Sequence, residues 1–173
     1  MLRAVGERPV ADAGVRSASR GTPRRRRKVT ASRDLGIDLR SGQERELFKW
    51  FLACLLFGKP IQQEVAARAY HEFLKAGVAT PEAILRAGWD DLVEVLDRGR
   101  YVRFDFSTAT KLLAVCEALK KQYGSLSALV AGAGGEGEIA RRLQAFKGVG
   151  PTTTRIFLRD VRRLWPARRR SRA

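Results

Sequence analysis

The segment FKGVGPTTTRIFL, residues 146–158, combines residue types that favour the binding of a phosphate group. Gly148 and Gly150 permit positive φ angles and place no Cβ over the turn. Pro151 suits the first position of a following helix, where a backbone N–H would have no helical partner. Such a turn would present free N–H groups at the positive end of a helix dipole, an arrangement that accepts phosphate. An ordinary helix–helix turn with a glycine C-cap would use the same residues.

Side chains beside this turn would add donors and charge to a phosphate site. Thr152 and Thr153 supply hydroxyl groups, and Lys147 and Arg155 flank the turn with positive charge. A contact of this kind, made with the backbone of a nucleic acid, reads no base sequence.

Two short helices, predicted over residues 137–146 and 151–165, must position the turn. Each carries an apolar stripe, and a connection this short requires the two stripes to face each other. The stripes comprise Ile139, Leu143 and Phe146 in the first helix and Ile156, Phe157, Val161 and Leu164 in the second.

The rest of the chain predicts further short helices and an all-α fold with seven or eight of them. Ser41 and Glu44 form the pattern of a capping box before a strongly apolar helix that ends at Gly58. A second helix is predicted to begin near residue 61, and a third is capped by Thr80 and ends at Gly88. Further helices are predicted over residues 90–99, over a longer stretch that begins at Ser107, and over residues 125–130. Residues 101–106 alternate like a strand but have no partner strand, so we expect an extended loop there.

The net charge of +16 is concentrated at the two ends of the chain. Residues 1–33 contain ten basic and two acidic residues, and residues 155–173 contain eight arginines and one aspartate, so the body is nearly neutral. This distribution favours a polyanionic partner, most often nucleic acid, although solvated charge runs that aid solubility are the simpler alternative. We expect a disordered basic tail over 1–33, one helical domain over 34–165 and a second basic tail over 166–173.

Several other classes of site have weak support in the sequence. Cys54 and Cys116 lie among apolar residues at helical spacing, so we expect buried structural thiols rather than an iron–sulfur cluster or a disulfide. The one histidine, His71, has no second histidine or cysteine near it, so we expect no metal site and no cofactor. No apolar run of about 20 residues is present. We expect a cytoplasmic monomer, associated with the nucleoid if the source is prokaryotic.

The segment LQAFKGVGPTTTRIFL resembles the helix-hairpin-helix of the endonuclease III-like DNA glycosylase superfamily, in which the hairpin follows the pattern L-P-G-V-G-x-K-T-A. The matching residues are Leu143, Phe146, Gly148, Val149, Gly150 and Thr153. A weaker resemblance extends over residues 41–165, through FLACLLFGKPIQQEVAARAYHEFL and the helices that follow, with Tyr101 in the "G-x-Y" segment. The resemblance implies an all-α fold, binding to duplex DNA with damaged or abasic sites, and an association with base-excision repair.

The chain departs from the family pattern at the catalytic residues and at the intercalating residue, and it lacks the iron–sulfur cysteines of the family. Thr152 occupies the position of the nucleophilic lysine, and the position of the catalytic aspartate falls near Arg170. Asp160 is the one acid after the hairpin and a weak candidate for catalysis; a surface ion pair with Arg163 is the simpler role. Lys59 replaces the family's intercalating glutamine and would either reach into DNA or remain a solvated loop lysine.

Three functions therefore remain open from the sequence. The first is a non-catalytic DNA-binding protein of the glycosylase type. The second is an active monofunctional glycosylase with an atypical acid, or one whose C-terminal part is missing from this chain. The third is a basic RNA- or ribosome-associated protein that uses the same turn on RNA.

Overall fold

The computed structural model describes residues 30–163, and every element of regular structure within this range is helical. Seven α-helices and two 3-10 turns follow one another without a strand in the described part, which confirms the all-α prediction. The turns are η1 (Ser32–Leu35) and η2 (Leu39–Ser41), and the helices are α1 (Glu44–Phe57), α2 (Gln63–Lys75), α3 (Pro81–Arg98), α4 (Asp105–Gln122), α5 (Leu126–Ala131), α6 (Glu136–Gln144) and α7 (Pro151–Val161).

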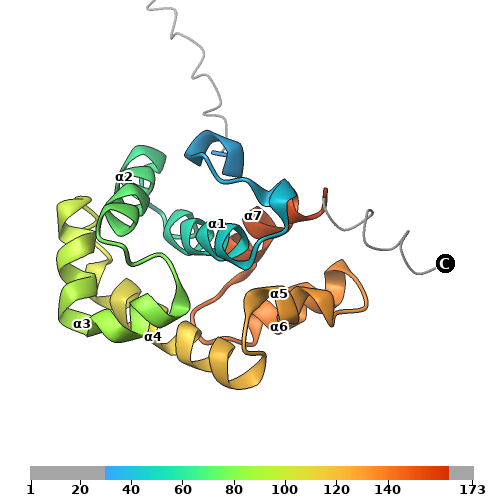
Figure 1. The fold of residues 1–173 in the computed structure, drawn as a ribbon. Coiled ribbons are helices and arrows are strands. Elements are labelled where there is room, and N and C mark those ends of the chain that lie inside the picture. The colour runs from blue at the N-terminus through green and yellow to red at the C-terminus, as the bar shows by residue number, and fades with distance from the viewer. Residues whose placement is uncertain (1–29, 164–173) are drawn as a thin grey trace, which may run out of the picture.

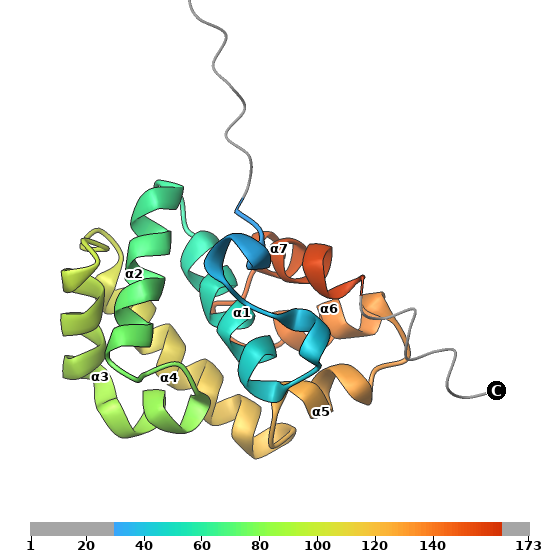
Figure 2. The same ribbon diagram turned by 45° about the horizontal axis from the view of Figure 1, so that its top comes forward.

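Helix α1 is the central element, and the other helices surround it (Figures 1 and 2). Helices α2, α3 and α4 lie on one side of α1, whereas α5, α6 and α7 lie on the other. Because α1 has neighbours on both sides, its sequence is apolar around most of its circumference rather than along one stripe. Phe48 and every residue from Trp50 to Leu56 are buried.

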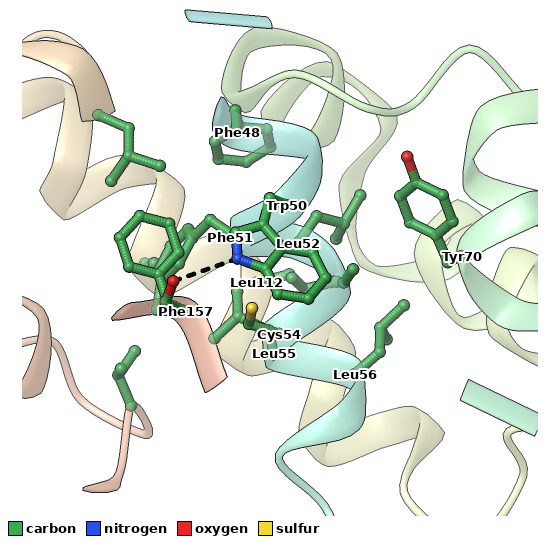
Figure 3. Packing of buried hydrophobic residues seen from close by; sticks show 14 of the residues in the cluster. Phe48, Trp50, Phe51, Leu52, Cys54, Leu55, Leu56, Tyr70, Leu112 and Phe157 are labelled. Atoms are coloured by element: carbon green, nitrogen blue, oxygen red, sulfur yellow. Dashed lines mark hydrogen bonds between the residues drawn. The ribbon is translucent and has the colours of Figure 1, made fainter. Parts of the chain in front are cut away.

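Aromatic rings and a buried hydrogen bond join α7 to α1 (Figure 3). The Trp50 indole Nε1 donates to the Phe157 carbonyl oxygen at 3.2 Å, and the Phe51 and Phe157 rings meet edge to face with centroids 5.6 Å apart. Cys54 and Cys116 are free and buried in the same core, as the sequence predicted. These contacts fasten α7 to the centre of the fold.

Two predicted helix starts are wrong, and the causes are different. The capping box of Ser41 and Glu44 does not form, because Gln43 precedes the helix and the Glu44 carboxylate accepts the N–H groups of Leu126 and Ser127 at 2.8 and 2.6 Å. Glu44 thus caps α5 instead of its own helix. Helix α4 begins at Asp105 rather than at Ser107, so residues 105–106 belong to its first turn.

The region around α3 agrees closely with the sequence pattern. The Thr80 hydroxyl accepts the N–H of Ala83 at 3.1 Å, and Pro81 occupies the first helical position. Gly88 interrupts the helix with φ 79° and ψ 177°, so the two helices predicted around it are separated by a sharp break.

The predicted boundary of the N-terminal tail needs correction. Residues 30–33 belong to the folded domain, because Thr30 bonds the Gln63 side chain at 2.8 Å and the Ser32 N–H bonds Asp160 at 2.7 Å. Residues 1–29 and 164–173, which include the rest of the predicted tails and Leu164, lie outside the described residues. In the described range, no helix combines the length and hydropathy that crossing a bilayer requires.

Candidate functional site

The α6–α7 turn, residues 145–150, is tight because one glycine adopts a left-handed conformation. Gly148 has φ +89°, and the Val149 N–H closes the turn onto the Phe146 carbonyl oxygen at 3.1 Å. Phe146 and Val149 point into the core and are buried. The apolar side chains therefore anchor the turn from beneath, and Val149 can offer a ligand only its backbone.

Gly150 does not adopt the positive φ that the sequence suggested for it. Its φ is −97° and its ψ 179°, which is extended backbone that any residue adopts. A Cβ atom at this position would have no heavy atom within 4 Å. The absence of a side chain at Gly150 is therefore not needed by the fold itself, and it leaves open space over the start of α7.

The start of α7 carries unpaired backbone donors. Within residues 30–163, no hydrogen-bond acceptor faces the N–H groups of Gly148, Gly150, Thr152 or Thr153. Pro151 has no N–H, and the first N–H that is satisfied belongs to Thr154, which bonds Gly150. These donors, together with the positive end of the α7 dipole, form an arrangement suited to a phosphate oxygen.

The three threonines after Pro151 face different surroundings. Thr152 is exposed, so its hydroxyl can reach a ligand. Thr153 is buried against Gly58 at the end of α1, where a Cβ on residue 58 would collide with the Thr153 Oγ1. The sequence predicts Thr153 as a hydroxyl donor to the phosphate, and its burial leaves that hydroxyl little surface for a ligand. Thr154 is buried too, and its hydroxyl donates to the Gly150 carbonyl oxygen at 2.9 Å, which fixes the end of the turn.

Lys111 lies beneath the turn, and sequence reasoning missed it. A Cβ at position 148 would lie 2.9 Å from both Cγ and Cδ of Lys111, so the lysine stem packs on the bare face of Gly148. Its Nζ lies 3.4 Å from the Leu55 carbonyl oxygen at the end of α1. Burial, with a smaller contribution from the charge of Lys59, lowers the pKa of Lys111 to about 8. The amine is thus a buried cation at neutral pH that loses its proton in mildly alkaline solution.

Lys59 follows α1 and joins this group of cations. Its Nζ lies 5.4 Å from the centroid of the Phe104 ring, in a cation–π contact, and the side chain is only partly exposed. Close by, the Tyr101 hydroxyl donates to the Leu56 carbonyl oxygen at 2.6 Å. Tyr101 and Lys111 together cap the end of α1, so the loop that carries Lys59 has a fixed starting point.

The cations around the turn lack acidic partners. Lys59, Lys111, Lys147 and Arg155 make no ion pair with any described residue. Many basic side chains elsewhere are paired, for example Arg142 with Glu138 at 2.6 Å and Lys120 with Glu82 at 2.7 Å. The turn therefore combines unpaired N–H groups with cations that no described acid neutralises.

Asp160 lies at the other end of α7, away from the turn. Its carboxylate pairs with Arg159 at 2.8 Å and accepts the Ser32 N–H, so the predicted pairing with Arg163 is wrong. Burial alone would raise the pKa of Asp160, but these hydrogen bonds hold it below the usual value. A residue ten positions beyond Gly150 on a helix lies about 15 Å along the axis. Asp160 thus fastens the N-terminal segment and does not contribute to the site at the turn.

The described residues show no cluster of metal-ligating side chains. No group of three or more His, Cys, Asp or Glu side chains in residues 30–163 is placed to hold a metal ion. His71 stands on α2, with its ring edge to face against Tyr70 at 5.5 Å. The groups that the turn offers to a ligand are hydrogen-bond donors and positive charge.

A comparison of the chain with protein-family models, curated proteins and solved structures finds no match.

Proposed function

We propose that this chain is a DNA-binding protein that holds the sugar–phosphate backbone at the α6–α7 turn. The observation that carries the proposal is the coincidence of four unpaired N–H groups with four cations that have no acidic partner among the described residues. A polyanion would satisfy both at once. The resemblance of this turn to a helix-hairpin-helix supports duplex DNA as the polyanion.

The binding we propose is independent of base sequence. The groups at the turn are backbone N–H donors, the Thr152 hydroxyl and flexible cations, all of which suit phosphate oxygens rather than base edges. The net charge of +16 would add a long-range attraction to DNA. We infer a role beside base-excision repair from the resemblance of residues 41–165 to endonuclease III-like enzymes.

Catalysis of base release is not part of this proposal. Thr152 stands where a nucleophilic lysine would be needed, and a hydroxyl forms no Schiff base with an abasic sugar. The carboxylate of Asp160 is engaged by Ser32 and Arg159 at the far end of α7. Incubation with uracil-, oxidised- and alkylated-base duplexes should therefore yield no alkali-dependent strand breaks. Breaks that disappear in Asp160→Asn would show that the chain is an enzyme.

The salt dependence of binding tests the DNA proposal. Each phosphate contact contributes about −0.9 to the slope of log K against log salt on duplex DNA. We expect a salt slope of several units for the full chain. Removal of residues 1–29 should make the slope smaller, but the contribution of the contacts at the turn should remain. Weak binding without a salt dependence, or no binding to duplex DNA at low salt, would refute the proposal.

A further inference from the structure

Two aromatic rings in contact with each other are exposed on the side of the fold formed by α3 and α4. Trp89 is 39% and Phe106 59% exposed, and their ring centroids are 5.2 Å apart. The Trp89 indole Nε1 donates to the Thr110 hydroxyl at 3.1 Å, and that hydroxyl donates to the Phe106 carbonyl oxygen at 3.0 Å. Adjacent exposed rings that are held in this way offer a partner apolar area at little further entropic cost.

Carboxylates border the two rings. Asp90 and Asp91 follow Trp89 directly and are exposed, and Asp105 directly precedes Phe106. None of the three acids forms an ion pair with a residue in the range 30–163. We call these five residues the acidic–aromatic patch.

A fourth carboxylate, that of Asp97 near the end of α3, interacts with Asp105. Desolvation, with the hydrogen bond and the charge of Asp105, raises the pKa of Asp97. Glu94, one turn earlier on α3, has its own cation, because Arg98 lies 3.2 Å away. Asp97 and Asp105 have no such partner among the described residues, so a positively charged group would be attracted to them.

The cations near the patch do not balance these four carboxylates. Arg103 lies 5.2 Å and Lys59 5.4 Å from the centroid of the Phe104 ring, so both are placed on that ring rather than on a carboxylate. Arg86 precedes the break in α3 and Arg100 follows the helix, and neither forms an ion pair within residues 30–163. The patch is therefore suited to a cationic partner with flat or apolar faces.

The chain itself contains a segment of the complementary charge. Residues 1–29 hold nine basic and two acidic residues, and eight of the nine are arginines. The segment joins the domain at Thr30, whose N–H and hydroxyl both donate to the Gln63 Oε1 atom at the start of α2.

The point of attachment allows this segment to reach the patch. Helix α2 packs on α3, and α3 packs on α4, all on the same side of α1 (Figure 2). A chain of 29 residues spans up to about 100 Å when extended, whereas α2 is only about 20 Å long. Attachment to the domain also raises the effective concentration of the arginines at the patch.

We propose that the acidic–aromatic patch binds the arginine-bearing segment 1–29 of the same chain. Guanidinium groups pair with the patch carboxylates and stack on the exposed faces of Trp89 and Phe106. The planar guanidinium suits both contacts, which a lysine ammonium does less well. This inference goes beyond the proposed DNA binding at the α6–α7 turn, and it implies that duplex DNA and the patch compete for the same arginines.

A spin label on the segment tests the contact in the full chain without DNA. Cys54 and Cys116 are buried, so Ser19→Cys supplies one accessible thiol for a nitroxide. At low salt we expect the label to reduce the height of the Trp89 indole N–H signal in NMR spectra. High salt should restore the signal, because exposed ion pairs are screened.

Two charge reversals at matched positions identify the patch. Asp91→Lys should restore the Trp89 signal in the labelled chain. Glu117→Lys makes the same change in charge on an exposed part of α4, about 18 Å along the helix from Asp105, and should leave the signal reduced. Asp91→Lys should also raise duplex affinity more than Glu117→Lys does, because it releases arginines for phosphate contacts.

Three results would overturn the inference. The first is a Trp89 signal that the label does not affect at low salt. The second is an equal reduction in the wild-type protein and in Asp91→Lys. The third is a reduction that disappears on dilution, which would assign the contact to the segment of a second copy. Because the NMR measurement contains no DNA, its outcome is independent of the binding of duplex DNA at the turn, which Gly150→Ala tests separately.

Discussion

The two ends of α7 show opposite uses of polar groups. At the C-terminal end, Asp160 binds Ser32 and Arg159, and the Arg159 Nη2 donates to the Thr30 carbonyl oxygen at 2.8 Å. Arg162 pairs with Glu136 through an Nε–Oε2 contact of 2.9 Å. At the N-terminal end, the N–H groups and the cations have no such partners among the described residues.

We infer from this difference that one end of α7 contributes to the stability of the fold and the other end to the binding of a ligand. Satisfied groups at the C-terminal end hold the N-terminal segment and α6 in place, so their removal should affect stability. The N–H groups at the N-terminal end have no partner among the described residues, so they are available to water or to a phosphate oxygen. Substitutions at the two ends should therefore act on different measurements.

The largest effect on stability is expected from Asp160→Ala. The substitution leaves the Ser32 N–H and the Arg159 guanidinium without their acceptor, which costs about 2–3 kcal/mol. Because the folded pKa of Asp160 is depressed, its contribution is present above its unfolded pKa and is lost as the pH falls through the folded pKa. Urea denaturation at pH 7 and at pH 3 measures this. Lost duplex affinity with unchanged stability would contradict the comparison.

Whereas Asp160→Ala should lower the free energy of unfolding, Lys111→Met should raise it. The pKa of Lys111 falls from 10.5 to about 8 on folding, so the unfolded chain binds more protons between these values. Stability of the wild-type protein should therefore rise as the pH increases from 8 to 10.5, and this rise should vanish in the variant. At pH 7 we expect Lys111→Met to add about 2 kcal/mol to the free energy of unfolding. Identical pH profiles for the two proteins would show that the amine is not desolvated.

Removing cations at the two ends should separate their roles in DNA binding. Lys147→Gln and Arg155→Gln should each reduce the salt slope by about 0.9 and leave the melting temperature almost unchanged. Arg162→Gln is the matched control, because it removes one charge from the same helix at the paired end. An equal change in salt slope for Arg162→Gln would show that the binding depends on the net charge of the protein and not on the cations at the turn.

The smallest expected effect distinguishes two neighbouring threonines. Thr152→Val removes an exposed hydroxyl and should weaken duplex binding by about 0.5–1.5 kcal/mol, the value of one hydrogen bond. Thr153→Val keeps the buried shape against Gly58 and should leave affinity unaltered. Titration of both variants at one salt concentration decides this, and a larger loss for Thr153→Val would place its hydroxyl at the ligand.

Local signals predicted much of the fold. Thr80 and Pro81 start α3, Gly88 breaks it, and the glycine at 148 turns the chain, because each depends on a few adjacent residues. The partners of Glu44 and Asp160 could not be predicted. Each carboxylate accepts an N–H that is far away in the sequence, and the residues next to it in the chain do not indicate such a partner.

The candidate site was predicted only in part for a similar reason. The turn itself is local, but Lys111 reaches it from a different helix. One sequence signal was available: Lys111 falls at helical spacing with Thr108 and Val115, which are buried on the same face of α4. The exposure of Trp89, Val102 and Phe106 carried no such signal, because the exposed fraction of a side chain depends on how distant helices pack.

The duplex affinity of Gly150→Ala tests the central claim most directly. The backbone at residue 150 is extended and a Cβ there would meet no protein atom within 4 Å, so the variant should fold with unchanged stability. The added methyl group would occupy the space in which we place the phosphate. We predict a loss of about tenfold or more in duplex affinity at matched salt, with a melting temperature equal to that of the wild-type protein. Unchanged affinity in a fully folded variant would contradict the assignment of the α6–α7 turn as the DNA-binding site.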